Sequence, residues 1–364
     1  MRTKSKKILK PIIISAVCII VCIPLVLMPT ATVIIYEAIF GVRYDPSDWN
    51  SLSAEDFEGL VLQKTEIEVN DEKSLAAFKY SRNGITPKGV VIVAHGLGGG
   101  GHTPYLPLID AFVRGGYYVF AYDATANGET DGSSVEGFPQ GIIDLELAIQ
   151  YVMEAPEYEE LPIALFGHSW GAYSTASVLG LYPDIEAAIV VAGFNESEDL
   201  ILYQGEKYVG STASLTTPYV YFYEQLKFTK KYADLSAIES MYGTDAGVMI
   251  VHSTDDSTVP TEYGYDKFYS EFSNDERFSF VLYEDRGHSN LFYSDSAREY
   301  RKILEENYEE YVESNGLKYN EATKTEFMSA NLNKSLYFEL DKALISQMLS
   351  FYDRYCNEQG VSQM

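Results

Sequence analysis

The sequence holds only 3 cysteines among 364 residues, and two of them, Cys18 and Cys22, lie in an apolar stretch near its start. Beyond that stretch only Cys356 remains, so the rest of the chain cannot form a disulfide with itself. Its stability must therefore come from a hydrophobic core. A hydrophobic content of 46% in a chain of this length is enough to build one, and it excludes general disorder.

Basic residues are also scarce, with 27 Lys and Arg against 53 Asp and Glu, which gives a formal net charge of −26 at pH 7. A surface this acidic repels nucleic acid and anionic lipid head groups. We expect neither to be a partner of the main domain.

Charge is absent altogether from Pro11 to Tyr36. As a helix this stretch would exceed the roughly 30 Å hydrocarbon core of a bilayer, so it predicts a membrane span. Five basic residues precede it, and the positive-inside rule then places the N-terminus in the cytoplasm and the acidic domain outside. A cleaved secretory signal is the alternative, but the run is long for a signal and no A-x-A site follows. Pro24 and Pro29 are expected to end or kink the helix.

A glycine-rich loop, His95 to His102, follows the apolar run Lys88 to Ala94. It lacks the G-K-[ST] ending of a phosphate-binding loop, which excludes a nucleotide site of that kind. Its backbone N–H groups, with Leu97 foremost, are instead placed to stabilise an oxyanion, and His95 and His102 are then supporting or surface residues.

Apolar runs alternate with helical patterns along the rest of the chain. This rhythm predicts a mostly parallel sheet with helices on both faces, preceded by two strands that form a hairpin. Ligand chemistry is expected beyond the carboxyl ends of the strands. The expected strands are Lys64 to Val69, Ser74 to Tyr80, Lys88 to Ala94, Tyr117 to Tyr122, Pro162 to Phe166, Ala187 to Ala192, Val248 to His252 and Phe278 to Tyr283.

Gly167-His168-Ser169-Trp170-Gly171 is a G-x-S-x-G motif between an apolar strand and a helix of small residues. This is the pattern of a nucleophile elbow, in which the serine occupies a strained turn and its flanking glycines let strand and helix approach closely. The pattern predicts Ser169 as a nucleophile.

A serine hydroxyl needs a base and an acid that orients the base. Of the five histidines, His288 is the candidate base because it follows the last predicted strand. Two acids, Asp255 and Asp256, follow the strand before it. The D-x-x-V-P arrangement favours Asp256, and Asp255 stays open as the alternative. The chain order Ser169, Asp256, His288 is that of α/β-hydrolases.

From about Lys64 onward the chain resembles the α/β-hydrolase superfamily, in the branch that includes monoacylglycerol lipases and serine-aminopeptidase-type hydrolases. The resemblance implies Ser169 as nucleophile, His288 as general base and then acid, Asp256 as its orienting acid, and the N–H groups of Leu97 and Trp170 as the oxyanion hole. The matching motifs are His95-Gly96-Leu97, Gly167 to Gly171, Asp256 with Val259-Pro260, and Gly287-His288. In the loop Asp123 to Gly132, Thr125, Ala126 and Thr130 replace the arginine, glycine and serine usual in the family.

These patterns divide the chain into a basic tip and transmembrane anchor (1–40), a connector (41–63) and an α/β-hydrolase domain (64–364). An aromatic, partly helical insertion at about 194–245 is expected to be a small lid, with a plain connecting helix pair as the alternative. A charged helical excursion is expected from Ser296 to Leu332, and one final helix from Leu336 to Tyr355 should pack on the sheet.

The sequence therefore predicts a membrane-anchored serine hydrolase that cleaves carboxylic esters of a small, apolar acyl substrate, with no metal or organic cofactor. Amide or peptide hydrolysis and acyl transfer, which use the same three residues, stay open. A catalytically silent surface module is the alternative outside the enzymes, because a fold does not determine a function. The oligomeric state is not predicted.

Overall fold

The computed structural model describes residues 22–70 and 73–362. The basic cluster and the first half of the expected membrane span lie outside these residues. Within them, eight strands form a single sheet in the order β1-β2-β4-β3-β5-β6-β7-β8. The strands are β1 (Val61–Asn70), β2 (Lys73–Ser81), β3 (Val90–Ala94), β4 (Tyr118–Tyr122), β5 (Ile163–His168), β6 (Ile185–Val191), β7 (Gly247–Ser253) and β8 (Phe278–Tyr283).

Six strands, from β4 to β8 in this order, run parallel, and the hairpin β1-β2 joins them antiparallel through β4. The expected strands are all present, with boundaries shifted by at most three residues. The five parallel strands from β3 to β7 are continuous apolar runs buried on both faces, apart from two partly exposed positions. The fold is that of an α/β-hydrolase, as the sequence predicts.

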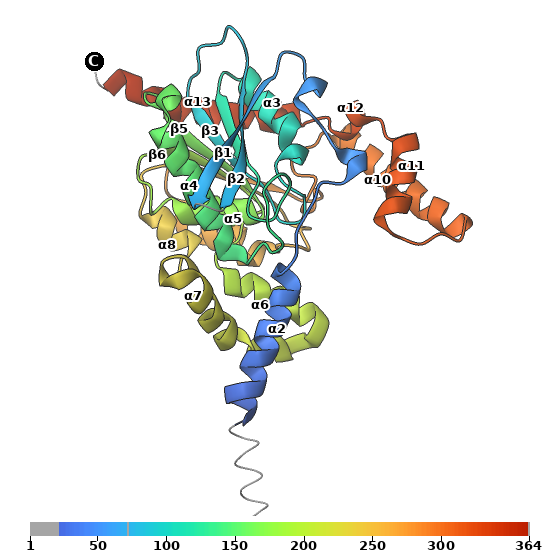
Figure 1. Cartoon of the computed structure of the whole chain (residues 1–364). Helices are drawn as coiled ribbons and strands as arrows, with labels where there is room; N and C mark the ends of the chain where they lie inside the picture. The colour runs from blue at the N-terminus through green and yellow to red at the C-terminus, as the bar shows by residue number, and fades with distance from the viewer. Residues whose placement is uncertain (1–21, 71–72, 363–364) are drawn as a thin grey trace, which may run out of the picture.

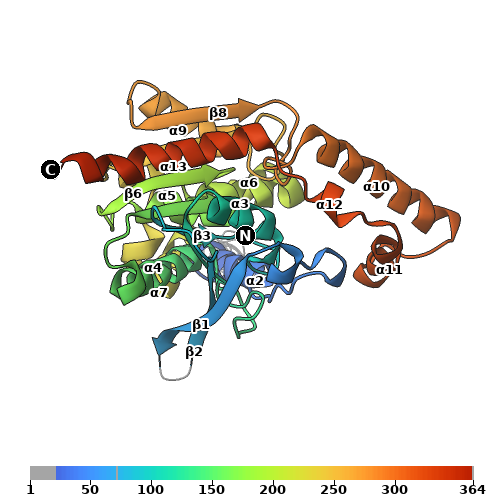
Figure 2. The ribbon, with the colours of Figure 1, turned by 90° about the horizontal axis from the view of Figure 1, so that it is seen from above.

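Helices cover both faces of this sheet (Figure 2). One face packs on α4 (Phe138–Glu154), α5 (Trp170–Val178), α8 (Ala237–Tyr242) and α9 (Tyr265–Phe272). The other face packs on α3 (Leu106–Arg114) and α13 (Lys342–Ser362).

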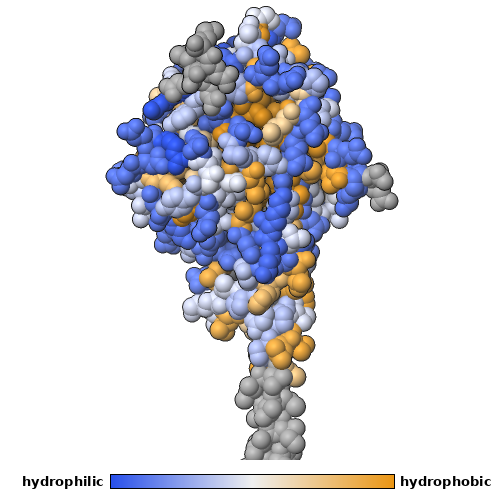
Figure 3. Space-filling model, turned by 90° about the vertical axis from the view of Figure 1, so that its left-hand side faces the viewer, coloured by the Kyte–Doolittle hydropathy of each residue, from blue (hydrophilic) through white to orange (hydrophobic). Residues whose placement is uncertain are grey.

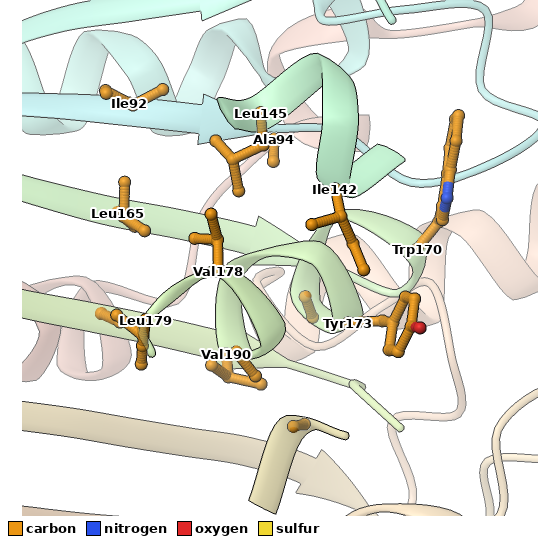
Figure 4. Packing of buried hydrophobic residues seen from close by; sticks show 14 of the residues in the cluster. Ile92, Ala94, Ile142, Leu145, Leu165, Trp170, Tyr173, Val178, Leu179 and Val190 are labelled. Atoms are coloured by element: carbon orange, nitrogen blue, oxygen red, sulfur yellow. The ribbon is translucent and has the colours of Figure 1, made fainter. Parts of the chain in front are cut away.

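The core beside α5 fixes the start of that helix. Figure 4 shows Trp170 and Tyr173 of α5 close to Ile142 of α4, with Val190 of β6 on the other side of the helix. All four side chains are essentially inaccessible to water. Burial of a large apolar side chain stabilises the fold by on the order of 1.5–3 kcal/mol. The packing of these side chains therefore holds the start of α5, and with it the turn before Trp170, in place.

The N-terminal helix consists of a π-helical turn (η1, Ile23–Leu27) that continues into α2 (Met28–Phe40). It runs four residues beyond the expected end of the membrane span at Tyr36, and its last turns pack on the domain, where Tyr36 and Phe40 are buried. Residues Ile23–Phe40, with a mean hydropathy of 1.8, are the one candidate membrane span among the described residues. The helix projects from one end of the molecule (Figure 1).

The connector, residues 41–63, wraps onto the domain as short turns before β1. It contains η2 (Asp48–Asn50) and η3 (Ala54–Asp56). Arg43 holds it through hydrogen bonds from its guanidinium to the carbonyls of Thr130 and Gly128.

Between β6 and β7 the chain forms α6 (Ser197–Val209), η6 (Gly210–Leu215), α7 (Thr217–Ala233) and α8. This is the segment expected as a lid. Its helix α7 packs against α4 and against α2 of the N-terminal helix.

The charged excursion forms α10 (Asp295–Ser314), α11 (Glu321–Asn331) and the short α12 (Lys334–Tyr337), which project from the side of the domain (Figure 1). The expected final helix from Leu336 to Tyr355 is interrupted. Leu340 pairs with Tyr293 in an isolated β-bridge, and the Asp341 carboxylate then accepts the N–H groups of Ala343 and Leu344 at the start of α13. Helical spacing carried no sign of this cap, because the apolar pattern continues across it.

Candidate active site

Ser169 occupies the sharp turn between β5 and α5, with φ 56° and ψ −115°. Such a left-handed backbone is strained for a residue with a side chain. Its neighbours have no room for one, since a Cβ on Gly167 would lie 2.2 Å from the Gly171 carbonyl oxygen, and a Cβ on Gly171 would lie 2.1 Å from the Ala94 oxygen. The two glycines of the motif are therefore required by the close approach of helix and strands, as the motif predicts.

Three predicted residues from three separate loops meet at this turn. Ser169 Oγ lies 2.9 Å from His288 Nε2, and His288 Nδ1 lies 2.7 Å from Asp256 Oδ2. The serine hydroxyl thus donates to Nε2 of the imidazole, and the Nδ1–H of the same ring donates to the carboxylate. The Asp256 side chain is fully buried, and that of His288 is 15% exposed.

The Asp256 carboxylate is held in the charged form. Burial alone would raise its pKa, but hydrogen bonds from His252 and His288, with backbone N–H groups added, lower the pKa well below its ordinary value. The two backbone donors are the N–H groups of Thr258 and Val259, each 2.8 Å from Oδ1. These bonds also fix the carboxylate's direction.

Asp255, the alternative acid, has a different set of partners. Its Oδ1 accepts the Gly287 N–H at 2.8 Å and the Ser253 hydroxyl at 2.5 Å. Of the two adjacent acids, Asp256 contacts the imidazole, and Asp255 ties the loop that carries His288 to the end of β7.

A second buried chain of hydrogen bonds runs behind Ser169, and sequence reasoning missed it. The Gly96 N–H donates to Tyr105 Oη at 3.0 Å, the Tyr105 hydroxyl lies 2.7 Å from His168 Nδ1, and His168 Nε2 lies 3.0 Å from the His288 carbonyl oxygen. Burial, reinforced by the nearby His288, lowers the pKa of His168 to about 3. The neutral ring can then accept from Tyr105 and donate to His288.

The expected oxyanion donors are Leu97, in the glycine loop, and Trp170, which follows Ser169 in the chain. Leu97 lines the same cavity as Ser169 and His288. Trp170 is the first residue of α5, where backbone N–H groups have no partner within the helix and the helix dipole favours negative charge. Its indole N–H donates to the Phe138 carbonyl at 2.9 Å, which fixes the residue.

His95 and His102 of the glycine loop, which the sequence predicts as supporting or surface residues, are both buried. His95 Nε2 accepts the Ala124 N–H, and His102 Nδ1 lies 2.7 Å from Asp123 Oδ1. Both therefore support the loops around the site.

A cavity of about 380 Å³ opens at Ser169 and His288. Besides the glycine loop, the segment 104–108 and the loop after His288, two further regions supply its walls: the connector and the stretch from α10 to the bridge at Leu340. Among the described residues, no member of the expected lid segment lines it, and the lid role stays a prediction. The wall residues from the two regions are Asp45, Ser47, Asn50, Arg301, Tyr337, Phe338 and Leu340.

Comparison with known proteins bears on the same region. A family model described as "Serine aminopeptidase, S33" matches residues 85–246, which include the glycine loop and the Ser169 turn but end before Asp256 and His288. Over these residues the chain is similar to the serine aminopeptidase family, and its fold is that of an α/β-hydrolase. No curated protein matches the sequence.

Two solved structures are similar to this chain. An esterase from Pyrococcus furiosus is 17% identical with a TM-score of 0.53, and the alignment covers 74% of this chain and 98% of the esterase. The acylaminoacyl peptidase of Pyrococcus horikoshii is 15% identical with a TM-score of 0.47, over 65% of this chain and 38% of the peptidase.

Proposed function

We propose that this α/β-hydrolase is a membrane-anchored serine hydrolase that cleaves carboxylic esters through an acyl-enzyme. The observation that carries the proposal is the line from Asp256 through His288 to Ser169, with both heavy-atom distances below 3 Å. A serine so placed is within reach of a base for proton removal, and the base is oriented by a charged acid.

In the proposed reaction, Ser169 Oγ attacks the ester carbonyl carbon while His288 Nε2 takes its proton. The N–H groups of Leu97 and Trp170 hold the negative oxygen of the tetrahedral intermediate. His288 then gives the proton to the leaving alcohol, and a C–O bond breaks to leave the acyl group on Ser169. A water then attacks the acyl carbon while His288 takes its proton. The bond from this carbon to Ser169 Oγ breaks, His288 returns the proton to Oγ, and the acid leaves. Asp256 stays ionised and stabilises the imidazolium at each step.

The cavity favours an apolar acyl group of small size. Its volume of about 380 Å³ is at the lower end for small-molecule pockets, and aromatic side chains form much of the wall. The aromatic residues are Tyr105, Phe292, Tyr293, Tyr337 and Phe338.

A panel of p-nitrophenyl esters with acyl chains of 2 to about 16 carbons tests this proposal. The full chain should hydrolyse the short and medium esters, and His288→Ala and Ser169→Ala should abolish the reaction without loss of fold by circular dichroism. A folded wild type that hydrolyses no ester at all would contradict the ester proposal.

Peptide hydrolysis is the second candidate, because the matching family model is described as a serine aminopeptidase. Aminoacyl p-nitroanilides tested beside the esters separate the two activities. An acyl acceptor added to the ester assay detects acyl transfer as a new product. A folded wild type that turns over none of these substrates would support a silent interaction module.

We further propose that the N-terminal helix is an uncleaved anchor, with the N-terminus cytoplasmic and the hydrolase domain outside the cell membrane. The apolar character of Ile23–Phe40 supports it. Docking of Tyr36 and Phe40 into the domain supports retention, because cleavage at the end of the helix would remove both buried side chains from the core. Intact mass measurement of the protein from membranes tests retention, and protease treatment of intact cells tests the side on which the domain lies.

A further inference from the structure

Five large apolar side chains are exposed on the segment expected as a lid. We call these five residues the α6–α7 face. They are Tyr208 (87% exposed), Val209 (57%), Leu215 (62%), Phe222 (60%) and Leu226 (85%). Single exposed apolar residues are common on soluble proteins, but five within one short helical segment are a mark of an interaction surface.

The α6–α7 face lies at the end of the molecule from which the N-terminal helix projects. Figure 1 shows α6 and α7 beside α2 at this end, and Figure 3 shows apolar residues around the point where the helix leaves the domain. Within the helix itself, Leu25, Ile34 and Ile35 are more than half exposed. The apolar surface of the face thus continues along the helix.

Polar contacts fix α7 to the helix. Glu37 Oε1 accepts hydrogen bonds from Tyr223 Oη and Lys227 Nζ, both at 2.6 Å. The buried Tyr36 hydroxyl donates to Glu224, which follows Tyr223 in α7, at 2.8 Å. Because these contacts hold α7 against the last turns of the helix, the face cannot move far from the place where the helix enters a membrane.

The charge of this segment differs from that of the whole chain. Residues 197–233 contain four acidic and four basic residues, whereas the chain carries a formal net charge of −26. The repulsion from a lipid surface that is expected of the acidic domain is therefore absent here. Exposed Tyr and Phe beside lysines are the residues that partition into the headgroup region of a bilayer.

We propose that the α6–α7 face rests on the lipid bilayer, with its five apolar side chains in the headgroup region beside the N-terminal helix. The proposal rests on the membrane anchor proposed above. It gives the segment between β6 and β7 a task other than covering the cavity, whose walls come from elsewhere. The hydrolase is then held in one orientation on the membrane by two contacts rather than by a single tether.

Tryptophan quenching in the full chain tests the proposal. The variants Leu226→Trp and Phe222→Trp are reconstituted in phosphatidylcholine nanodiscs with and without brominated acyl chains. The matched controls are Leu25→Trp within the candidate span and Tyr319→Trp, exposed in the turn between α10 and α11. Fluorescence of the unsubstituted chain, from Trp49 and Trp170, is subtracted.

We expect brominated lipid to quench Leu25→Trp strongly and to reduce the emission of Leu226→Trp and Phe222→Trp by about twofold, with no change for Tyr319→Trp. Quenching at Leu25 without quenching at Leu226 and Phe222 would overturn the docked face and leave the anchor intact. No quenching at Leu25 either would overturn both. Ester hydrolysis measured in the same samples reports on the proposed activity independently of these outcomes.

Discussion

Two of the buried carboxylates, those of Asp256 and Glu224, have pKa values shifted in opposite directions. Asp256, after β7, accepts two backbone N–H groups and the imidazole N–H of His288, and its pKa is held well below the ordinary value. Glu224, in α7, accepts only the hydroxyls of Tyr36 and Ser197, both through Oε1, while the buried Oε2 has no partner. Burial there dominates and raises the pKa of Glu224 to about 7.

The difference teaches that burial alone does not decide the charge of an acid. Burial disfavours the carboxylate in both places, and at Asp256 it is outweighed by the hydrogen bonds from two histidines and from backbone N–H groups. Around Asp256, the loop geometry supplies enough donors to keep a permanent negative charge beside a histidine. The junction of α2, α6 and α7 supplies too few, so Glu224 exchanges its proton near neutral pH.

Removing the negative charge of Asp256 tests the carboxylate that accepts several hydrogen bonds. Asp256→Asn keeps the shape but presents an amide to His288, which disfavours the tautomer that accepts the Ser169 proton. We expect kcat for ester hydrolysis to fall by about 10³–10⁴-fold. Asp255→Asn is the matched control, since Asp255 contacts the backbone of Gly287 and not the imidazole. An equal loss in both variants would contradict the assignment of Asp256.

Tyr105→Phe tests whether the hydrogen-bond chain behind the serine positions the site. The change removes the hydroxyl that links the Gly96 N–H to His168, and His168 in turn donates to the His288 backbone. We expect kcat to fall about tenfold with KM little changed, because lost positioning acts on the transition state. Tyr293→Phe, which lines the same cavity, should leave kcat within about twofold. A rise in KM with unchanged kcat would show that Tyr105 contacts substrate instead.

The pH dependence of stability tests Glu224, the buried carboxylate that accepts few hydrogen bonds. The folded pKa of Glu224, about 7, lies above the ordinary value of 4.5, so the folded state binds more protons in this interval. The stabilisation is full below pH 4.5 and is lost as pH rises through 7, with a total of about 3 kcal/mol. Glu224→Gln should therefore match the wild type near pH 5 and exceed its unfolding free energy at pH 8.

Urea unfolding of the full chain in detergent micelles at the two pH values measures this effect. The matched control is Glu196→Gln, an acid at the start of α6 that is not fully buried. It should change the pH dependence less. Equal pH dependence in wild type and Glu224→Gln would show that the Glu224 carboxyl is ionised in the fold.

Much of the fold follows from local patterns. The buried strands are continuous apolar runs, and the turn at Ser169 is dictated by glycines that admit no Cβ, so both are visible in sequence. The positions of Ser169, Asp256 and His288 after strands also place them at one edge of the sheet. The D-x-x-V-P arrangement favours Asp256 in sequence, and the direction of the two adjacent side chains in the structure separates it from Asp255.

Other features depend on contacts between distant segments. Tyr105 carries no motif, and its role arises because the turn just before α3 brings its hydroxyl to His168, 63 residues away. The cavity walls from the connector and from α10 to Leu340 follow from packing of Trp49 against Tyr337, whose rings lie 5.8 Å apart. The last turns of the N-terminal helix are apolar, and hydropathy assigns them to the membrane span, although Tyr36 and Phe40 are buried in the domain. Hydropathy does not distinguish lipid from a protein core.

The central claim is that Ser169 is an activated nucleophile. Peptide mass spectrometry of the full chain after reaction with a fluorophosphonate probe tests it most directly. We predict a single phosphonyl adduct on the peptide that contains Ser169, absent from Ser169→Ala and from His288→Ala. An adduct on another residue, or a folded wild type that takes up no probe, would contradict the account.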